Sequence, residues 1–564
     1  MFIFNGILKI CLCELKPLQA LDISDNDLNG LPSCLANLTN LQVLDISSNE
    51  FTGNISLSPI GSLTSIRDLR LSDNRFRIPI SLGPFFNLSN LKNLFGDNNE
   101  VYESTELEHN LIPRFQLQAL SLACNGFGGT FPRFLYYQRD LQHVDLSYIK
   151  MTGEFPSWLL QNNTKLEQLY LVNNSLSGSF QLPNHSLVNL SRLDISRNEI
   201  DNQIPTEIGS CFPRLVFLNL SRNHFGGSIP SSISNMSALE VLDLSNNGLS
   251  GNIPEQLVEG SLSLRVLVLS NNHLKGQLLW RSFNLAHLTD LILSRNQLTG
   301  ILPDSLSNGS SLGILDVSLN NLTGKLPRWI GYMSSLQYLD ISENNLSGSL
   351  PGIVLKYFTG IDLSCNNLTG EIPVELGNLI SNIKALNLSH NSLTGPIPST
   401  FSNLKDIESL DLSYNNLNGE IPRQLINLDF ISVFSVAHNN LSGKTPEMVK
   451  QFSTFNSSCY EGNLLLCGPP LAKNCTGGRP PSPVPRPQTH NKEENGFIDM
   501  GAFMVTFSVA YIMVLLAIGS VLYINPSWRR AWFYFIGESI NNCYYFLVDN
   551  LPVPARFRRF QPCV

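Results

Sequence analysis

The sequence is poor in charge, in clustered cysteines and in basic segments, and each shortage excludes a class of protein. Only 15% of the 564 residues are charged, and the net charge of -8 comes without the basic stripe of a nucleic-acid-binding protein. The eleven cysteines are scattered and odd in number, unlike the dense disulfide framework of a small secreted domain. No cysteine pair has zinc-ligand spacing with matching histidines. We expect buried or free thiols at every cysteine except Cys467 and Cys475.

Catalytic motifs are lacking as well. No nucleophile–base pair and no metal cluster stands out from the repeat consensus described below. Residues 525–564 contain neither a phosphate-cradling glycine loop nor a catalytic aspartate motif, and they are too few for a kinase. We therefore expect a protein that is not an enzyme, that needs no cofactor or metal, and that does not bind nucleic acid.

Leucine, asparagine, serine and glycine recur at a fixed period along most of the chain. The pattern L-x-x-L-x-L-x-x-N-x-L-x-G repeats at a nearly constant interval through eighteen units in one register. Such self-similarity, at a period within the range of leucine-rich repeats, identifies a leucine-rich-repeat array. The turn position is occupied in order by Asn26, Asn49, Asn74, Asn99, Asn125, Ile149, Asn174, Asn198, Asn223, Asn247, Asn272, Asn296, Asn320, Asn344, Asn366, Asn391, Asn415 and Asn439.

Each unit predicts a short strand followed by a buried turn. In residues 242–244 two leucines point inward and the aspartate between them points outward, which is the alternation of a strand. The turn asparagine can satisfy backbone groups that would otherwise cost about 1–3 kcal/mol each. Since no unit buries its apolar face alone, only the stack is stable. The sequence predicts an α/β solenoid, a leucine-rich-repeat superhelix of about 18 repeats with a parallel concave sheet.

The ends of the chain depart from the repeat. Residues 1–17 form a weak signal-like or truncated N-terminus, 18–446 the repeat array and 447–476 a C-terminal cap in which the chain leaves the repeat register. Cys467 and Cys475 are placed to staple this cap, with Cys459 as a spare cysteine that could compete for either partner. Residues 477–499 form a proline-rich and acidic linker. Residues 500–524 carry no charge and predict a transmembrane helix, which leaves 525–564 as a short cytoplasmic tail.

The orientation of the span follows from its surroundings. Basic residues near the two ends of the span are balanced, but all seventeen Asn-x-Ser/Thr sequons precede it. We therefore expect extracellular repeats in a single-pass plasma-membrane protein. The candidate N-glycosylation sites are Asn37, Asn54, Asn87, Asn162, Asn173, Asn184, Asn189, Asn219, Asn235, Asn308, Asn321, Asn345, Asn367, Asn387, Asn440, Asn456 and Asn474.

The C-terminal motifs carry a family resemblance. The tract from Gly360 to Cys475, with GIDLSCNNLTGEIP and YEGNLLLCGPPL, is similar to the last repeats and cap of plant leucine-rich-repeat receptor-like proteins. ENGFIDM, VLYINPSWRRAWFYFI and CYYFLVDNLP resemble the span and tail of this family. The resemblance implies a kinase-less receptor that binds an extracellular peptide or protein ligand. It also implies signalling through adaptor and co-receptor receptor-like kinases, in defence or in development.

Three departures from the family pattern bear on function. A clear signal peptide and an N-terminal cysteine-bearing cap are missing, which favours a truncated N-terminus. The island that commonly precedes the last four repeats is absent, because the interval from Asn344 to Asn366 is the shortest in the array. If relatives contact ligand through that island, this chain must use another surface or none. Ile149 replaces a turn asparagine and the unit at 95–107 is degenerate, so we expect local irregularity there.

The outward strand positions are the best candidates for ligand binding, since the repeat consensus does not constrain them. Aromatic and arginine side chains are the usual anchors of protein interfaces. The outward aspartates, such as Asp243, Asp340, Asp362 and Asp411, belong instead to the consensus. A stripe of small residues in the span, Ala502, Thr506 and Ala510, would let a partner helix approach closely. The candidate ligand-binding residues are His143, Tyr170, Arg197, Phe217, Arg222, Arg265, Arg295 and Tyr338.

Four functions fit these features. The leading hypothesis is a ligand-sensing receptor in defence, and a developmental peptide receptor has the same architecture. An inhibitor-like binder of a microbial wall-degrading enzyme is disfavoured by the span and the patterned tail. A truncated, non-signalling product is the fourth possibility. Sequence alone does not separate the first two.

Overall fold

The structure is a computed structural model that describes residues 15–103, 112–124, 128–260, 263–278, 287–351, 358–379 and 383–475. The chain divides into two units, Met1–Cys475 and Thr476–Val564. The predicted linker, the span at 500–524 with its small-residue stripe, and the tail all lie outside the described residues. Within the described residues, no helix combines the length and the apolar character needed to cross a bilayer.

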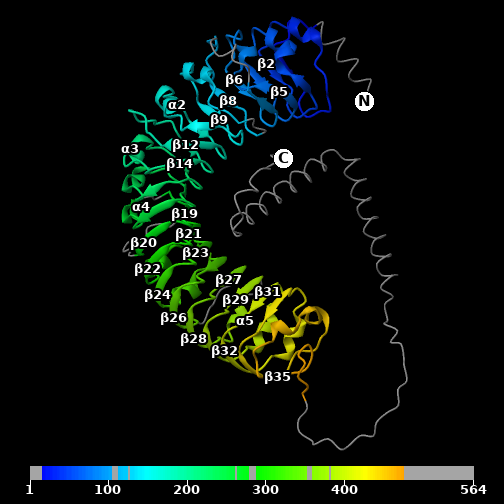
Figure 1. The fold of residues 1–564 in the computed structure, drawn as a ribbon, viewed down its shortest axis with the longest axis vertical. Coiled ribbons are helices and arrows are strands. Elements are labelled where there is room, and N and C mark those ends of the chain that lie inside the picture. The colour runs from blue at the N-terminus through cyan, green and yellow to red at the C-terminus, as the bar shows by residue number, and fades with distance from the viewer. Residues whose placement is uncertain are drawn as a thin grey trace, which may run out of the picture. The chain divides into compact units, whose positions relative to one another are not determined.

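The repeats stack as coils, each contributing one strand to a parallel sheet of 18 strands. This confirms the number of repeats predicted from the sequence. Figure 1 shows strands of this sheet on the inner, concave side of the stack, with α2, α3 and α4 on its outer side. The strands are β1 (Ala20–Asp22), β2 (Val43–Asp45), β4 (Asp68–Arg70), β6 (Asn93–Phe95), β8 (Ala119–Ser121), β9 (His143–Asp145), β11 (Gln168–Tyr170), β13 (Arg192–Asp194), β15 (Phe217–Asn219), β17 (Val241–Asp243), β19 (Val266–Val268), β21 (Asp290–Ile292), β23 (Ile314–Asp316), β25 (Tyr338–Asp340), β27 (Gly360–Asp362), β29 (Ala385–Asn387), β31 (Ser409–Asp411) and β33 (Val433–Ser435).

A second row of strands, the lateral ribbon, runs along one flank of the coils. It consists of two three-stranded pieces and one piece of 11 strands. Glycines with positive φ, such as Gly251 at +80°, permit the bend in each coil. The strands are β3 (Thr52–Asn54), β5 (Arg75–Pro79), β7 (Glu100–Tyr102), β10 (Thr152–Glu154), β12 (Ser175–Ser179), β14 (Glu199–Asp201), β16 (Gly226–Gly227), β18 (Gly248–Gly251), β20 (His273–Gln277), β22 (Gln297–Gly300), β24 (Asn321–Lys325), β26 (Asn345–Ser349), β28 (Asn367–Glu371), β30 (Ser392–Pro396), β32 (Asn416–Glu420), β34 (Asn440–Lys444) and β35 (Leu465–Cys467).

Short helices connect the lateral ribbon to the next concave strand. Many begin directly after the proline of the Ile-Pro or Leu-Pro motif, as at Pro230 and Pro398, where the fixed φ of proline suits a helix start. The α-helices are α2 (Ser157–Asn162), α3 (Ile208–Cys211), α4 (Glu255–Gly260) and α5 (Leu376–Leu379). The 3-10 helices are η1 (Ser33–Asn37), η2 (Ile55–Leu57), η3 (Pro59–Ser62), η4 (Gly83–Phe85), η6 (Arg133–Tyr137), η7 (Ser231–Asn235), η8 (Asp304–Asn308), η9 (Arg328–Tyr332), η10 (Ser399–Asn403), η11 (Arg423–Asn427), η12 (Lys450–Thr454) and η13 (Ser457–Cys459).

The turn asparagines form the predicted ladder of hydrogen bonds between coils. The Asn198 amide nitrogen donates to the carbonyls of Leu171, Ile195 and Ser196 at 2.8, 3.1 and 3.2 Å. Its amide oxygen accepts the backbone N–H of Leu176 at 3.0 Å. One side chain therefore satisfies four backbone groups that the turn would leave unpaired. The apolar residues on either side of the turn are fully buried, so ladder and core stabilise the same contacts.

The coil of Ile149 forms its lateral strand, β10, which pairs with β12. Among the described residues the lateral ribbon is interrupted twice, between β7 and β10 and between β14 and β16, and the first interruption lies directly before this coil. Among the described residues, the first piece of the ribbon ends at Tyr102 and the next begins at Thr152, with only a bridge between Gly129 and Met151 near the gap. Ile149 itself is fully buried. The unit at 95–107 is more regular than expected, because it forms β6 and β7 and its Asn99 accepts the N–H of Phe76 at 2.9 Å. Residues 104–107, the end of this unit, lie outside the described residues.

The predicted departure from the repeat register in the cap is wrong. Asn463 continues the asparagine ladder, with its amide nitrogen 2.9 Å from the Val436 carbonyl and its oxygen 3.0 Å from the Leu441 N–H. Strand β35 extends the lateral ribbon and pairs with β34. A nineteenth coil therefore covers the eighteenth. The interval from Asn439 to Asn463 equals the preceding repeat interval and was the signal for this coil, but Ser458 and Tyr460 stand where the repeat usually has leucines.

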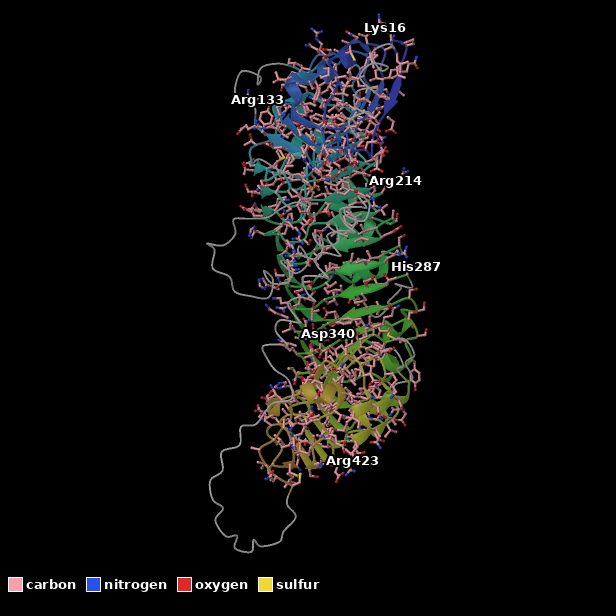
Figure 2. The ribbon with its side chains drawn as sticks, turned by 90° about the vertical axis from the view of Figure 1, so that its right-hand side faces the viewer. Lys16, Arg133, Arg214, His287, Asp340 and Arg423 are labelled. Carbon is pink, nitrogen blue, oxygen red and sulfur yellow. A yellow bond between two sulfur atoms is a disulfide. The ribbon has the colours of Figure 1, made fainter. Side chains whose placement is uncertain are left out.

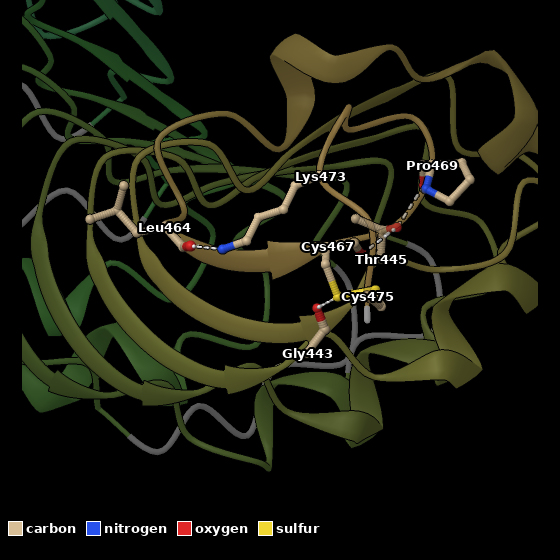
Figure 3. The surroundings of a disulfide bond; sticks show 7 residues. All are labelled: Gly443, Thr445, Leu464, Cys467, Pro469, Lys473 and Cys475. Carbon is tan, nitrogen blue, oxygen red and sulfur yellow. Dashed lines mark hydrogen bonds between the residues drawn. A yellow bond between two sulfur atoms is a disulfide. The ribbon is translucent and has the colours of Figure 1, made fainter. Parts of the chain in front are cut away.

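The disulfide expected between Cys467 and Cys475 is present beside this last coil. The two Cα atoms are 5.0 Å apart, and Thr445 donates its hydroxyl to the Pro469 carbonyl at 2.6 Å (Figure 3). Lys473 reaches back to the Leu464 carbonyl at 2.7 Å (Figure 3). The disulfide thus fixes the exit of the chain against the final coil. Cys459, the spare cysteine, is a half-buried free thiol.

The expectation of a thiol at Cys34 is wrong. Cys34 is disulfide-bonded, whereas Cys211, Cys365 and Cys459 are free thiols. Cysteine spacing alone pointed only to the C-terminal pair, since a bond between distant cysteines leaves no local sequence motif. Both ends of the described array therefore carry a disulfide-bonded cysteine.

Candidate ligand-binding surface

Most concave strands bury their middle residue and turn the two flanking residues outward, whereas β1 leaves Leu21 half-buried and β8 buries all three of its residues. Figure 2 shows Asp340, one such outward residue, near the middle of the concave face. His143 and Phe217 begin β9 and β15, Tyr170 ends β11, and Tyr338 begins β25. Arg265 directly precedes β19. Five of the eight predicted residues therefore lie on or beside the concave strands.

The structure brings three of the predicted residues into one cluster on neighbouring strands. The rings of His143 and Tyr170 lie 5.9 Å apart. Next along the sheet, the Arg192 guanidinium lies 5.8 Å from the centre of the Phe217 ring, close enough for a cation–π contact. Because β11 pairs with β13 and β13 pairs with β15, the two contacts lie on neighbouring strands and form a continuous strip.

Two residues of this strip were missed by the sequence analysis. Gln168 pairs with His143 on one side and with Arg192 on the other in the strand register. Its side-chain oxygen lies 3.1 Å from Nδ1 of His143. Arg192 in turn is opposite Phe217. Equal register in successive units was the available signal. We name the five residues His143, Gln168, Tyr170, Arg192 and Phe217 the aromatic strip.

Partly buried carboxyls border the aromatic strip. Burial raises the pKa of Asp145 and of Asp194, although hydrogen bonds from Ser147 and Ser196 oppose the shift. Burial also raises the pKa of Tyr170, so the phenol stays protonated and can donate a hydrogen bond. The strip therefore offers aromatic faces, a guanidinium and hydrogen-bonding groups on rigid strands, which suits a peptide with mixed side chains.

Tyr338 lies in a different, acidic part of the concave face. It occupies the coil of Asp340, whose carboxyl is opposite Asp316 on one side and Asp362 on the other. Burial raises the pKa of Tyr338 to about 12, and the three aspartates add to the shift. Burial likewise raises the pKa of Asp340 to about 6, with Asp316 and Asp362 adding to the shift. The Asp340 carboxylate accepts the N–H and hydroxyl of Ser342 at 3.0 and 2.6 Å, as a consensus residue would.

The three predicted turn arginines form a separate column beside the sheet. Arg197, Arg222 and Arg295 have φ of 57°, 54° and 54° and directly precede turn asparagines. Each of them directly precedes its turn asparagine and so follows the end of its concave strand, where Tyr170 is the last strand residue in its own coil. These arginines belong to the turns, whereas the aromatic strip is built from strand positions, and their role in ligand binding stays a prediction.

The same turn column contains a ring stack that the sequence analysis missed. His390, Tyr414 and His438 stack with ring centres 4.1 and 4.2 Å apart. Nε2 of His438 lies 3.6 Å from the Glu461 carboxylate of the last coil. Rings at one register in successive units were the signal for this stack. All three residues have a left-handed backbone conformation, so each ring projects from the same point of its coil.

Arg265 is not part of either cluster. It lines a shallow cavity of about 550 Å³ with Ser263, His287, Thr289 and Ser311. The Thr289 hydroxyl donates to the Arg265 carbonyl at 3.0 Å. In Figure 2, His287 lies toward one edge of the coils, away from the centre of the concave face. Across the described ranges, no group of three or more histidine, cysteine, aspartate or glutamate side chains could hold a metal ion.

The sequons occupy several faces of the coils. Asn321, Asn345, Asn367 and Asn440 begin lateral strands and are exposed. Asn219 and Asn387 instead lie on the concave face, where their side chains bind Ser221 and Ser389 in the manner of the consensus aspartates. Glycosylation at the predicted sites stays a prediction. Sugar on the four lateral positions would leave the concave face open.

Comparison with known proteins agrees with this geometry. A leucine rich repeat family model matches residues 286–346, 358–417 and 381–441, and a single-repeat model matches 40–63, 189–211, 214–236 and 238–259. The chain is 52% identical over 211 residues to Cuscuta receptor 1 of Solanum lycopersicum. It is 33% identical over 159 residues to Receptor-like protein 1 of Arabidopsis thaliana. These matches cover 37% and 28% of this chain but only 19% and 15% of the two relatives.

Solved structures share the fold. The ectodomain of the Arabidopsis receptor kinase HAESA, in complex with an N-terminally extended IDA peptide hormone, is similar with a TM-score of 0.67 and 29% identity, over 81% of this chain and 79% of that one. HAESA in complex with IDA and the co-receptor SERK1 gives a TM-score of 0.64 at 29% identity, over 81% of this chain and 88% of that one. The stacked coils and the varied concave residues define a plant-type leucine-rich-repeat solenoid. Over the matched tracts the chain is similar to plant leucine-rich-repeat receptor-like proteins.

Proposed function

We propose that this protein is a cell-surface receptor whose concave face binds an extracellular peptide, and that the aromatic strip is the principal contact. The cation–π contact between Arg192 and Phe217 and the ring contact between His143 and Tyr170 carry this proposal. These side chains are anchored on a continuous sheet, so little conformational entropy is lost when a ligand binds. The similarity to a repeat ectodomain in complex with a peptide hormone supports a peptide as ligand.

Signalling through partner receptor kinases completes the proposal. The similar HAESA ectodomain was crystallised with a co-receptor. We infer that ligand on the concave face recruits a co-receptor kinase, and that an adaptor kinase associates through residues 500–524. The role we favour is defence. The peptide hormone complexes among related structures support a developmental peptide receptor as the second candidate.

The test uses the full-length chain expressed in leaf cells that lack it. Cells are treated with a microbial culture extract or with a plant secreted-peptide extract, and co-purification with adaptor and co-receptor kinases is measured. We expect one extract to increase co-receptor recovery and the double variant Tyr170→Ala, Phe217→Ala to abolish the increase. A response to the plant extract alone would favour the developmental role.

Tyr332→Ala is the matched control, because Tyr332 is 71% exposed on η9, away from the concave strands. It should respond like the unaltered chain. Equal responses from the double variant and the unaltered chain would remove the aromatic strip from the proposal. No increase with either extract, despite surface expression, would contradict the receptor function itself.

A further inference from the structure

A cavity of about 740 Å³ lies on the flank of the coils, away from the aromatic strip. It is bounded by η6 and α2, by β10 and by the segment after β5. Figure 2 places Arg133, one of its lining residues, at the opposite edge of the coil stack from Arg214 and His287. Its volume is within the range of about 300–1,000 Å³ that is usual for small-ligand sites.

The cavity lies at the interruption of the lateral ribbon. Lining residues come from both sides of the gap, with Glu103 following β7 and Glu154 ending β10. In the coils from Gly248 to Lys444 the lateral strands pair without a break. The cavity therefore lies next to the coil of Ile149, at the first of two interruptions of the lateral ribbon among the described residues.

Stacked aromatic rings form one wall of the cavity. The Tyr136 and Trp158 rings lie 3.9 Å apart with planes inclined by 21°. Phe131 meets Trp158 edge-on, with ring centres 6.0 Å apart. Tyr136 is 44% exposed although it belongs to a packed 3-10 helix. An aromatic ring with an exposed face is a platform for the C–H groups of a flat ligand.

This wall is held in place by hydrogen bonds to its backbone. Nη1 of Arg139 donates to the Tyr136 carbonyl at 2.6 Å. Nε2 of Gln116 donates to the Tyr137 carbonyl at 2.9 Å, and its Oε1 accepts the Arg139 N–H at 2.9 Å. The end of η6 is therefore fixed by its neighbour coil. A fixed platform loses little entropy when a ligand binds.

Polar groups of both kinds surround the rings. The cavity is lined by two exposed carboxylates, Glu103 and Glu154, and by one exposed guanidinium, Arg133. Hydroxyls of Ser81 and Thr130 also line it. Carboxylates accept, guanidinium groups donate, and hydroxyls do both, so a ligand rich in hydroxyl groups finds partners on every side. The excess of carboxylates disfavours a polyanion.

We propose that this flank cavity binds a neutral oligosaccharide, with a sugar ring stacked on Tyr136 and its hydroxyls bound by Glu103, Glu154 and Arg133. A sugar ring combines an apolar C–H face with hydroxyls around its edge, which is the combination that the cavity offers. A polyuronide would meet two carboxylates against one guanidinium. An extended peptide is better suited to the concave sheet. The site is separate from the aromatic strip and does not depend on the proposed receptor function.

The experiment is calorimetric titration of the purified full-length chain with cellohexaose, chitohexaose or an oligogalacturonide of equal length. The first two probes represent neutral chains of plant-wall and microbial-wall type, and the third tests charge. We expect one neutral probe to bind with a dissociation constant below about 1 mM and the oligogalacturonide to bind at least tenfold more weakly. Binding by Tyr136→Ala and by Glu154→Gln should be weaker by tenfold or more.

Tyr332→Ala is again the matched control. Tyr332 is the fifth residue of η9 as Tyr137 is of η6, and Gly331 stands where η6 has Tyr136. This variant should bind like the unaltered chain. Thermal unfolding of every variant shows whether the fold is retained. Trp158→Phe, which keeps an aromatic ring, provides a second test if Tyr136→Ala is unfolded.

Three results would overturn the proposal. One is the failure of both neutral probes to bind at about 5 mM, a concentration of roughly five times the expected limit. Another is binding that is unchanged in both the Tyr136→Ala and Trp158→Phe variants while these remain folded. The third is tighter binding of the oligogalacturonide than of either neutral probe. None of these results bears on the concave face.

Discussion

The coils around Ile149 and those from Asn320 to Asn463 share one core but differ on their flanks. In the later coils every turn asparagine binds its neighbours, and the lateral ribbon is unbroken from β24 to β35. Directly before the coil of Ile149 the concave sheet continues through β8, β9 and β11, whereas the described part of the lateral ribbon is interrupted between β7 and β10. A second interruption, between β14 and β16, occurs where Asn198 and Asn223 both bind their neighbours, so the lateral ribbon varies more readily than the concave sheet.

This comparison separates two ways of making a binding surface. In the regular coils, variety is confined to outward side chains on a fixed backbone, as in the stacked rings of His390, Tyr414 and His438. In the interrupted coils the backbone itself departs from the repeat, and a cavity opens beside Tyr136 and Trp158. The first device suits an extended ligand along many coils, and the second suits a compact one.

The largest expected effect is the loss of a ladder asparagine. Asn198→Leu would leave three carbonyls and the Leu176 N–H without their side-chain partner in a buried turn. We expect the free energy of unfolding to fall by about 3–5 kcal/mol. Since repeat arrays open locally, hydrogen exchange of the Leu176 amide measures the effect together with the melting temperature.

Ile149→Leu is the matched variant in the interrupted region. Its side chain keeps its volume and forms no ladder bond, so we expect a loss of less than about 1.5 kcal/mol. Equal destabilisation by the two substitutions would show that packing in the turn, rather than the amide ladder, distinguishes the two regions.

A smaller effect is expected where coils approach closely on the helical side. Gly209 in α3 occupies the register that Leu160 occupies in α2, as counted from Pro205 and Pro156. A Cβ on Gly209 would lie 1.7 Å from the Ser232 carbonyl oxygen, so the coils would have to separate. We expect Gly209→Ala to lower the free energy of unfolding by about 1–3 kcal/mol, measured by thermal unfolding.

Gly226→Ala is the control for this glycine. A Cβ on Gly226 would meet nothing within 4 Å, and we expect little change. If Gly209→Ala were as stable as Gly226→Ala, the coils on the helical side would be able to move apart at little cost in free energy. A glycine would then not be required at position 209.

The sequence predicted what repeats itself and missed what depends on neighbouring coils. Period and turn asparagines gave the solenoid, its 18 concave strands and the ladder. Arg192 and Gln168 were missed because their role depends on side chains one repeat away along the chain, at equal register on adjacent strands. The nineteenth coil was missed because Tyr460, and not leucine, fills its buried position.

The flank cavity could not be predicted for a different reason. Ile149 predicted an irregular unit, but the sequence did not indicate which part of the coil would differ from the other coils. The concave sheet is stabilised by buried leucines whether or not the turn asparagine is present, whereas the cavity depends on how η6 and α2 pack beside the gap. A departure from the repeat consensus is visible in the sequence, but the backbone conformation that it produces is visible only in the structure.

The smallest expected effect compares two aspartates at one register, one in the first coil and one in the middle of the sheet. Burial and the neighbouring Asp316 and Asp362 raise the pKa of Asp340 to about 6. The folded protein therefore binds more protons than the unfolded chain between about pH 4 and pH 6, and the free energy of unfolding falls as the pH rises through this window. Asp340→Asn keeps the acceptor for Ser342 and removes this slope, so we expect a gain of about 1 kcal/mol at pH 7 after solvent screening.

Asp22 in the first coil should behave in the opposite way. The hydrogen bonds from Ser24 hold the pKa of this exposed carboxyl below its usual value, so its contribution is present at neutral pH and is lost as the pH falls. Thermal unfolding of Asp22→Asn and Asp340→Asn from pH 4 to pH 7 measures both slopes. If the free energy of unfolding changed with pH in the same direction at both positions, the charge environment of the consensus aspartates would not depend on their position in the array. The acidic middle of the concave face would then not differ electrostatically from its end.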